Sequence, residues 1–159
     1  MLKVEYPVTL SYIFDGNRKG AKYSTDSGAT YMNAGEFLEA LTKHCKGYKA
    51  EKDANTAFDK GSDLAELNAS IKSSKATLTT KNLGGSFDEI LQSYFKSVPS
   101  TLWIWAVLVD DTLVTYEMNR TEFEQFTRQW ASYSENRSVI RYKVTSNIMI
   151  QWLEERCGE

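Results

Sequence analysis

One lysine and several small polar residues alternate with apolar residues between Leu67 and Ser74. Side chains of a β-strand point alternately to its two faces, so Ala69 and Ile71 are predicted to share the inner face with Leu67. The opposite face then carries Asn68, Ser70, Lys72 and Ser74. A lysine lined up with small polar groups on one side of a half-buried strand is an arrangement that displays a binding or catalytic site. We therefore place the candidate site on this strand.

A helix is predicted before this strand. Asn33 is followed three residues later by Glu36, which is the spacing of a capping box. The helix then runs to about Cys45, and Gly47 is predicted to end it. Its buried stripe is predicted to consist of Phe37, Leu38, Leu41 and Cys45. Two glutamates, Glu36 and Glu39, therefore lie near the beginning of this helix.

A second helix and a long apolar strand follow the candidate strand. Ser86 and Glu89 form another capping box, and apolar residues recur at helical spacing up to Pro99. The nine residues Thr101 to Val109 carry no charge, which is typical of a central strand covered on both faces. We predict that the strand Ser70 to Ser74 lies next to this apolar strand or one strand away. Ile71 is then inside and Lys72 faces a cleft.

The rest of the chain alternates between strand and helix patterns. We predict an edge strand at Val4 to Phe14, and a hairpin turn at Asp110-Asp111 that leads to a strand at Thr112 to Met118. A helix capped at Asn119 to Thr121 and a strand at Ser138 to Val144 are predicted next. Ser146 is predicted to begin a last helix, with Ile150 and Leu153 on its inner side. Mixed elements in this order predict an α+β fold, α/β-like in character, with a single central mixed β-sheet flanked by helices. We expect residues 1–159 to form one domain.

Composition excludes several classes of function. The 19 basic and 21 acidic residues leave a net charge of -2, so there is no general attraction to nucleic acid and any contact needs a local patch. With one histidine, His44, a histidine-rich metal site is not expected. Two cysteines, Cys45 and Cys157, are too few for a disulfide framework and favour a reduced, cytoplasmic setting. No membrane segment, signal peptide, glycine-rich phosphate loop or nucleophile elbow is found.

The order of elements between about Gly35 and Val109 resembles the restriction-endonuclease-like superfamily, the PD-(D/E)XK nucleases. The residues that carry the resemblance are the helix beginning GEFLEALTKHCKGY, Asp63, the strand SIKSS, the following helix and the apolar strand. The resemblance implies that Asp63 is a Mg²⁺ ligand and that Lys72 orients the attacking water. It also implies that Glu36 or Glu39 completes the site from the helix. Magnesium prefers oxygen ligands and activates water for attack on a phosphodiester.

The chain departs from this family at one position. Two residues before the lysine the family has Asp or Glu, whereas this chain has Ser70, a weaker ligand for a hard cation. A carboxylate of Glu36 or Glu39 is the replacement that the sequence offers. Each candidate also has a structural role: Asp63 follows Gly61-Ser62 as a turn residue does, and Glu36 is accounted for by the capping box.

Eight basic residues spread along the chain are candidates for one phosphate-binding face: Arg18, Lys19, Lys72, Lys75, Lys81, Arg137, Arg141 and Lys143. Around the strand, we predict Ser70, Ser74, Lys75 and Lys81 as nucleic-acid contacts, with DNA favoured over RNA. The sequence predicts a small Mg²⁺-dependent nuclease or a nuclease-derived DNA-processing protein. The alternative is an inactive protein on the same scaffold, carried by a phage or mobile element, which inhibits a host nuclease.

Overall fold

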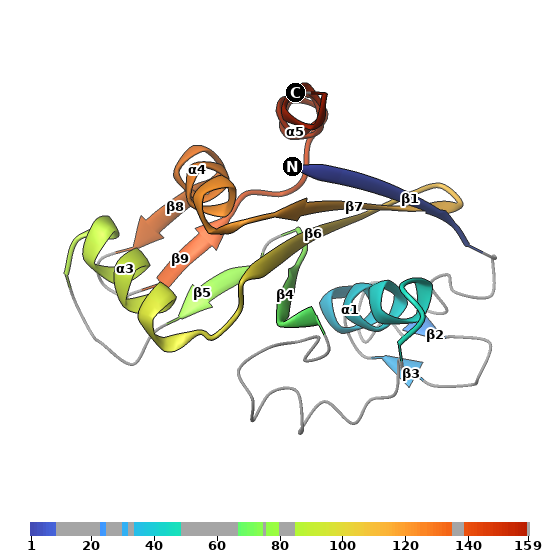
Figure 1. Cartoon of the computed structure of the whole chain (residues 1–159), viewed down its shortest axis with the longest axis horizontal. Helices are drawn as coiled ribbons and strands as arrows, with labels where there is room; N and C mark the ends of the chain where they lie inside the picture. Colours follow the sequence, from blue (N-terminus) through green and yellow to red (C-terminus); the bar gives the residue numbers. More distant parts are fainter. Residues whose placement is uncertain are drawn as a thin grey trace.

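A four-stranded mixed sheet lies at the centre of the molecule (Figure 1). The computed structural model describes residues 1–8, 23–24, 30–31, 34–48, 67–74, 76–79, 85–134 and 139–158. The strand order of this central sheet is β1-β7-β6-β4, formed by β1 (Leu2–Pro7), β7 (Thr112–Met118), β6 (Leu102–Val109) and β4 (Ala69–Lys72). β7 is antiparallel to both β1 and β6, and β4 is parallel to β6.

The predicted neighbourhood of the candidate strand is confirmed. β4 pairs directly with β6, so that Ser70 lies opposite Trp103 and Lys72 lies opposite Trp105. Parallel strands need a long connection, and the chain between β4 and β6 includes helix α3 (Phe87–Ser97). The predicted capping box begins this helix: the Ser86 hydroxyl accepts from the Glu89 backbone N–H, and the Glu89 carboxylate accepts from the Ser86 N–H.

A second sheet departs from the single sheet that we predicted. It has the order β5-β9-β8 and is antiparallel, formed by β5 (Thr77–Thr79), β9 (Val139–Tyr142) and β8 (Ala131–Ser134). We call it the outer sheet. The chain leaves the central sheet after Lys72, turns at Ser73, whose carbonyl accepts from the Ala76 N–H, and enters β5. A short pair of strands, β2 (Tyr23–Ser24) and β3 (Thr30–Tyr31), is separate from both sheets. The α+β class is confirmed.

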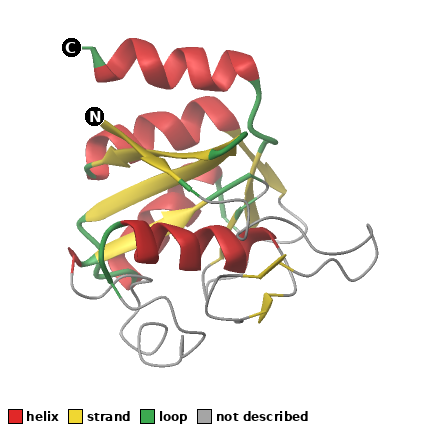
Figure 2. Cartoon of the chain, turned by 90° about the vertical axis from the view of Figure 1, so that its right-hand side faces the viewer, coloured by secondary structure: helices red, strands yellow, loops and turns green. Residues whose placement is uncertain are grey.

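Helices cover both faces of the central sheet (Figure 2). Helix α1 (Ala34–Cys45) packs on one face and builds a core that we call the α1-side core. Its buried residues are Phe37, Ala40, Leu41, Ala69, Ile71, Ile104, Ala106 and Leu113. Phe37 and Leu41 were predicted for the buried stripe, and Gly47 follows the helix with a φ of 86° that favours glycine. Asn33 lies outside the described residues.

The opposite face of the central sheet carries a core rich in aromatic rings. Helices α3, α4 (Arg120–Trp130) and α5 (Asn147–Cys157) enclose it together with the outer sheet. We call it the aromatic core, and its largest buried members are Trp103, Trp105, Tyr116, Phe123, Phe126 and Tyr142. Trp103 stacks on Phe123 with ring centroids 5.2 Å apart. Such ring pairs add about 0.5 to 1.5 kcal/mol each to the burial of apolar area.

The two C-terminal helices begin where the sequence predicted. Asn119 caps α4 in a capping box with Glu122, and the Ser146 hydroxyl accepts from the Met149 N–H at the start of α5. One detail of α5 was wrong: Met149 and Leu153 are fully buried, whereas Ile150 is only partly buried. The buried side of α5 therefore follows Met149 and Leu153, which are four residues apart.

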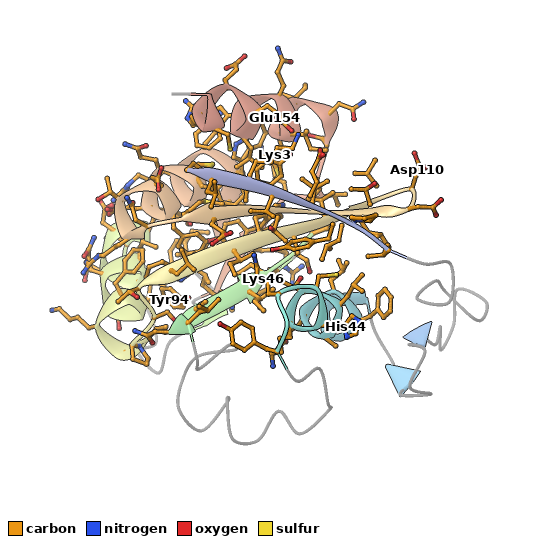
Figure 3. All side chains as sticks on the ribbon, turned by 45° about the vertical axis from the view of Figure 1, so that its right-hand side comes forward. Lys3, His44, Lys46, Tyr94, Asp110 and Glu154 are labelled. Carbon is orange, nitrogen blue, oxygen red and sulfur yellow. The ribbon has the colours of Figure 1, made fainter. Side chains whose placement is uncertain are left out.

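Ion pairs attach α5 and Lys46, the residue that follows α1, to the sheet; Figure 3 labels Lys3, Glu154 and Lys46. The Lys46 ammonium lies 3.2 Å from Glu117 and 2.9 Å from the Tyr6 hydroxyl. On the other side, the Lys3 ammonium lies 2.7 Å from Glu154, and the Tyr116 hydroxyl donates to the same carboxylate. Burial opposes ionisation of Glu154, but the hydrogen bonds from Lys3 and Tyr116 outweigh it and lower the Glu154 pKa.

Candidate functional site

Asn68, the residue immediately before β4, fixes the position of the strand. Its φ of 50° lies in the left-handed region, which asparagine tolerates better than most residues. The Asn68 amide donates to the Pro99 carbonyl at 2.8 Å, and the Asn68 carbonyl accepts from the Thr101 N–H at 2.9 Å. These bonds join the start of β4 to the junction between α3 and β6. The register that sets Lys72 opposite Trp105 therefore begins at Asn68.

Ser70 is buried, contrary to the prediction that it is displayed on an open polar face. Its side chain belongs to the face of β4 that adjoins Trp103, because paired residues of parallel strands share a face. The residue is 4% exposed, and its hydroxyl lies 2.7 Å from the hydroxyl of Ser100. The physical reason is that the aromatic core covers this face of the sheet as well. Ser70 is therefore not accessible to nucleic acid.

Lys72 is half-buried at the carboxyl end of β4. Alternation puts its side chain on the Trp105 face, and the Trp105 indole N–H donates to the Thr145 hydroxyl at 3.3 Å. Among the described residues, the Lys72 ammonium has no hydrogen-bond or ion-pair partner. A cation that is partly withdrawn from water, with no acidic partner among the described residues, is a candidate for binding an anion from outside.

Glu39 lies on a different side of the sheet from Lys72. It belongs to α1, and α1 packs on Ala69 and Ile71, the residues of β4 that point away from the Lys72 face. The Glu39 carboxylate lies 3.3 Å from the ammonium of Lys43, which is largely buried. Glu36 is part of the same helix, but its side chain lies outside the described residues, as does the whole of Asp63. The described structure therefore does not bring Glu39 and Lys72 together.

Ser74, which was predicted as a nucleic-acid contact, is exposed just beyond Lys72. Its hydroxyl accepts from the Thr145 backbone N–H at 3.0 Å, which holds the end of β4 beside the segment after β9. Lys75 and Lys81, the other predicted contacts, lie outside the described residues.

The predicted Mg²⁺ ligands are only partly covered by the described residues. Within them, no group of three or more His, Cys, Asp or Glu residues is close enough to hold a metal ion. Ser70 stands where the resembled family has a carboxylate, and its hydroxyl is already bonded to Ser100. Asp63 and the side chain of Glu36, the other predicted ligands, lie outside the described residues.

Neither cysteine is activated as a nucleophile. Burial raises the pKa of the Cys45 thiol above its usual value, although the charge of Lys46 acts in the opposite direction. Burial also raises the pKa of Cys157, and the nearby Glu154 carboxylate raises it further. A raised pKa keeps a thiol protonated and unreactive at neutral pH. The chemistry of the candidate site therefore depends on oxygen and nitrogen groups.

Sequence reasoning missed two residues that shape the site, Ser100 and Thr145. The Ser100 hydroxyl is hydrogen-bonded to the Ser70 hydroxyl across 30 positions of the chain, and Thr145 contacts both Trp105 and Ser74. No local sequence pattern predicts a hydrogen bond between side chains so far apart in sequence. A serine directly before a buried strand, as Ser100 is, was the one available signal.

Comparisons of the chain with protein-family models, curated proteins and solved structures found no match. Among the described helices, none combines the length and the apolar content that crossing a membrane requires.

Proposed function

We propose that the chain is a nuclease-derived DNA-processing protein in which Lys72 faces the phosphate backbone. The observation that supports this proposal is the environment of Lys72: half-buried, at the carboxyl end of a strand parallel to a buried neighbour, and without a partner among the described residues. A lysine ammonium is a compact point charge with three donors, suited to one non-bridging phosphate oxygen. Hydrolysis of the phosphodiester bond would rest on Asp63, because Glu36 belongs to α1, which packs on the face of β4 opposite to Lys72.

The proposal is tested by incubating the protein with supercoiled plasmid, linear duplex, single-stranded DNA and RNA, each with Mg²⁺ or Mn²⁺. We expect cleavage of DNA by the wild type, and its loss in Lys72→Ala and in Asp63→Ala. Lys96→Ala is the matched control, because Lys96 is an exposed lysine on α3 outside the candidate site. Removing the Lys72 side chain should change stability by about 1 kcal/mol or less, so lost activity will not reflect unfolding.

A second candidate is an inactive protein on the same scaffold that inhibits a host nuclease. Two contacts favour it: the Ser70 hydroxyl is closed off by Ser100, and Glu39 is paired with Lys43. Neither residue is then available as the missing acidic ligand. Under this proposal the wild type cleaves no substrate under any metal condition and binds no Mg²⁺ in calorimetry, and Lys72→Ala leaves inhibition of a susceptible nuclease unchanged. Cleavage by the wild type that requires Lys72 would eliminate this candidate.

A further inference from the structure

The exposed side of the outer sheet carries two cations, one of which, Arg141, lies between two hydroxyl residues. Arg141 and Lys143 are exposed, whereas Ile140 and Tyr142, which alternate with them along β9, are buried in the aromatic core. We call the surface formed by Thr77, Ser132, Arg141 and Lys143 the basic face.

The strand register arranges these residues in a row. Arg141 lies opposite Thr77 of β5 on one side and opposite Ser132 of β8 on the other. Residues that are directly paired point to the same face of a sheet, so a guanidinium stands between two hydroxyls. Lys143 is two residues further along the same face, about 7 Å away at ~3.4 Å per residue. Its backbone N–H donates to the Trp130 carbonyl, which continues the strand pairing to this point.

The fold leaves the two cations of the basic face unneutralised. Neither Arg141 nor Lys143 has an ion-pair partner in the part of the chain that the structure describes. Lys3, Lys46 and Arg128, by contrast, each lie within 3.3 Å of a carboxylate. The strands β5, β8 and β9 contain no acidic residue. This face is therefore locally positive on a chain whose net charge is -2.

The basic face offers no aromatic ring to a nucleic-acid base. Tyr142 is 1% exposed, and the Tyr133 hydroxyl donates to the Gly85 carbonyl while its ring packs on Phe87. Proteins that hold single strands stack bases on exposed aromatic rings. A sheet surface whose described residues offer cations and hydroxyls, with the neighbouring rings turned inward, fits the phosphates and sugars of a double helix instead.

The basic face is continuous with the carboxyl end of β4. Thr145, two residues beyond Lys143, donates its backbone N–H to the Ser74 hydroxyl, and its own hydroxyl accepts from Trp105, the neighbour of Lys72. We infer that the basic face binds the phosphate backbone of duplex DNA, without reading its bases, and leads the duplex to Lys72. This inference rests on the proposed function, since it assigns the surface by which the same DNA is held.

The test measures binding of a fluorescein-labelled 20-base-pair duplex by anisotropy at several salt concentrations. Neutralising a phosphate contact lowers the steepness of log K against log salt by about 0.9, which corresponds to roughly eightfold weaker binding at ~0.1 M salt. We expect this change for Arg141→Gln and again for Lys143→Gln, while Arg141→Lys retains the wild-type slope. Lys96→Gln, with the same change of charge on α3, should bind as the wild type does.

Each outcome decides a separate point. If the wild type binds DNA and Arg141→Gln and Lys143→Gln weaken that binding no more than Lys96→Gln does, the basic face is not the binding surface. The proposed function would still stand. Tighter binding of the single strand than of the duplex would overturn the assignment to double-stranded DNA. A wild type that binds neither would remove the proposed function together with this inference. If the basic face binds an acidic protein instead of DNA, the expected result is this third one, in which the wild type binds neither form of DNA.

Discussion

Two short strands with similar alternation, β4 and β9, use their polar faces in opposite ways. In β4 the apolar pair Ala69 and Ile71 packs under α1, and the polar pair turns toward the aromatic core. In β9 the apolar pair Ile140 and Tyr142 enters the aromatic core, and Arg141 turns to solvent. Alternation therefore identifies which residues share a face, but the layers around each sheet decide whether that face is open.

The difference has a chemical consequence for both strands. A covered polar face must be satisfied from within the protein, and Ser70 is satisfied by Ser100. An open polar face is satisfied by water or by a ligand, as at Arg141 of β9, which has no ion-pair partner among the described residues. Lys72 is intermediate, since it lies where the covered face of β4 ends at the edge of the core.

The largest expected effect comes from putting a charge on the covered face. Ser70→Asp restores the residue type of the resembled nuclease motif but places a carboxylate in a site that is 4% exposed. We expect unfolding to become easier by about 3 kcal/mol in urea titrations followed by circular dichroism. Ser74→Asp, on the exposed side of the same segment, should change stability by no more than about 0.5 kcal/mol. Equal effects of the two substitutions would contradict the assignment of covered and open positions.

The same variant gives a dependence on pH. Burial raises the pKa of a carboxyl group, so Asp at position 70 would be tolerated better when protonated. The stability lost in Ser70→Asp should therefore be smallest at low pH and should grow as the pH rises through the raised folded-state pKa. Ser70→Ala, which removes one hydrogen bond and adds no charge, should cost about 1 kcal/mol at every pH.

A smaller effect is expected from releasing the start of β4. Asn68→Ala loses the bond to Pro99 and forces alanine into the left-handed region, so we expect a loss of about 2 kcal/mol. Asn68→Gly keeps the backbone conformation and loses the side-chain bonds alone, which should cost about 1 kcal/mol. Thermal unfolding of both variants measures the difference. If alanine is tolerated as well as glycine, backbone conformation at Asn68 does not hold the strand.

Strand β1 offers a third case, in which an outward cation is neutralised. Glu154→Gln removes the charge that pairs with Lys3 but keeps an acceptor for Tyr116. The pair is partly exposed and screened, so the loss should stay below about 1 kcal/mol at neutral pH. Because the Glu154 pKa is lowered in the folded state, this stabilisation is complete above pH 4.5 and is lost as the pH falls further. The difference between the denaturation midpoints of the two proteins should therefore shrink as the pH falls below 4.5.

The smallest effect is expected on the open face of β9. Arg141→Gln and Lys143→Gln remove side chains without an ion pair in the described structure, so stability should change by about 0.5 kcal/mol or less. Any increase, from reduced repulsion between the two cations, would sharpen the contrast with β4. A loss above 1 kcal/mol in melting experiments would show that these side chains serve the fold.

Strong local signals predicted much of the fold. The uncharged run Thr101 to Val109 became β6, and Ser86 and Asn119 became helix caps because a cap depends on residues three positions away. β5 and β8 were missed: the first has three residues, and the second follows α4 directly, without a glycine or proline to mark the boundary. Both belong to the outer sheet, whose pairing is set by distant segments.

The candidate site was predicted only in part, for the same reason. The pairing of β4 with β6 followed from composition and alternation, and it is confirmed. The burial of Ser70 depends on Ser100 and on the aromatic core, which bring together segments far apart in sequence. The roles assigned to Asp63, Glu36, Lys75 and Lys81 stay predictions.

The pairing of β1 with β7 determines when this edge of the central sheet can form during synthesis of the chain. Leu2 lies opposite Glu117, so 115 residues separate the two partners along the chain. A ribosome that adds ~5 to 20 residues per second needs roughly 6 to 23 s to synthesise that interval. Until β7 has been synthesised, β1 has no partner strand, and Lys3 and Glu5 keep its surface polar. We expect the central sheet to close at this edge only after the β6–β7 hairpin has left the ribosome.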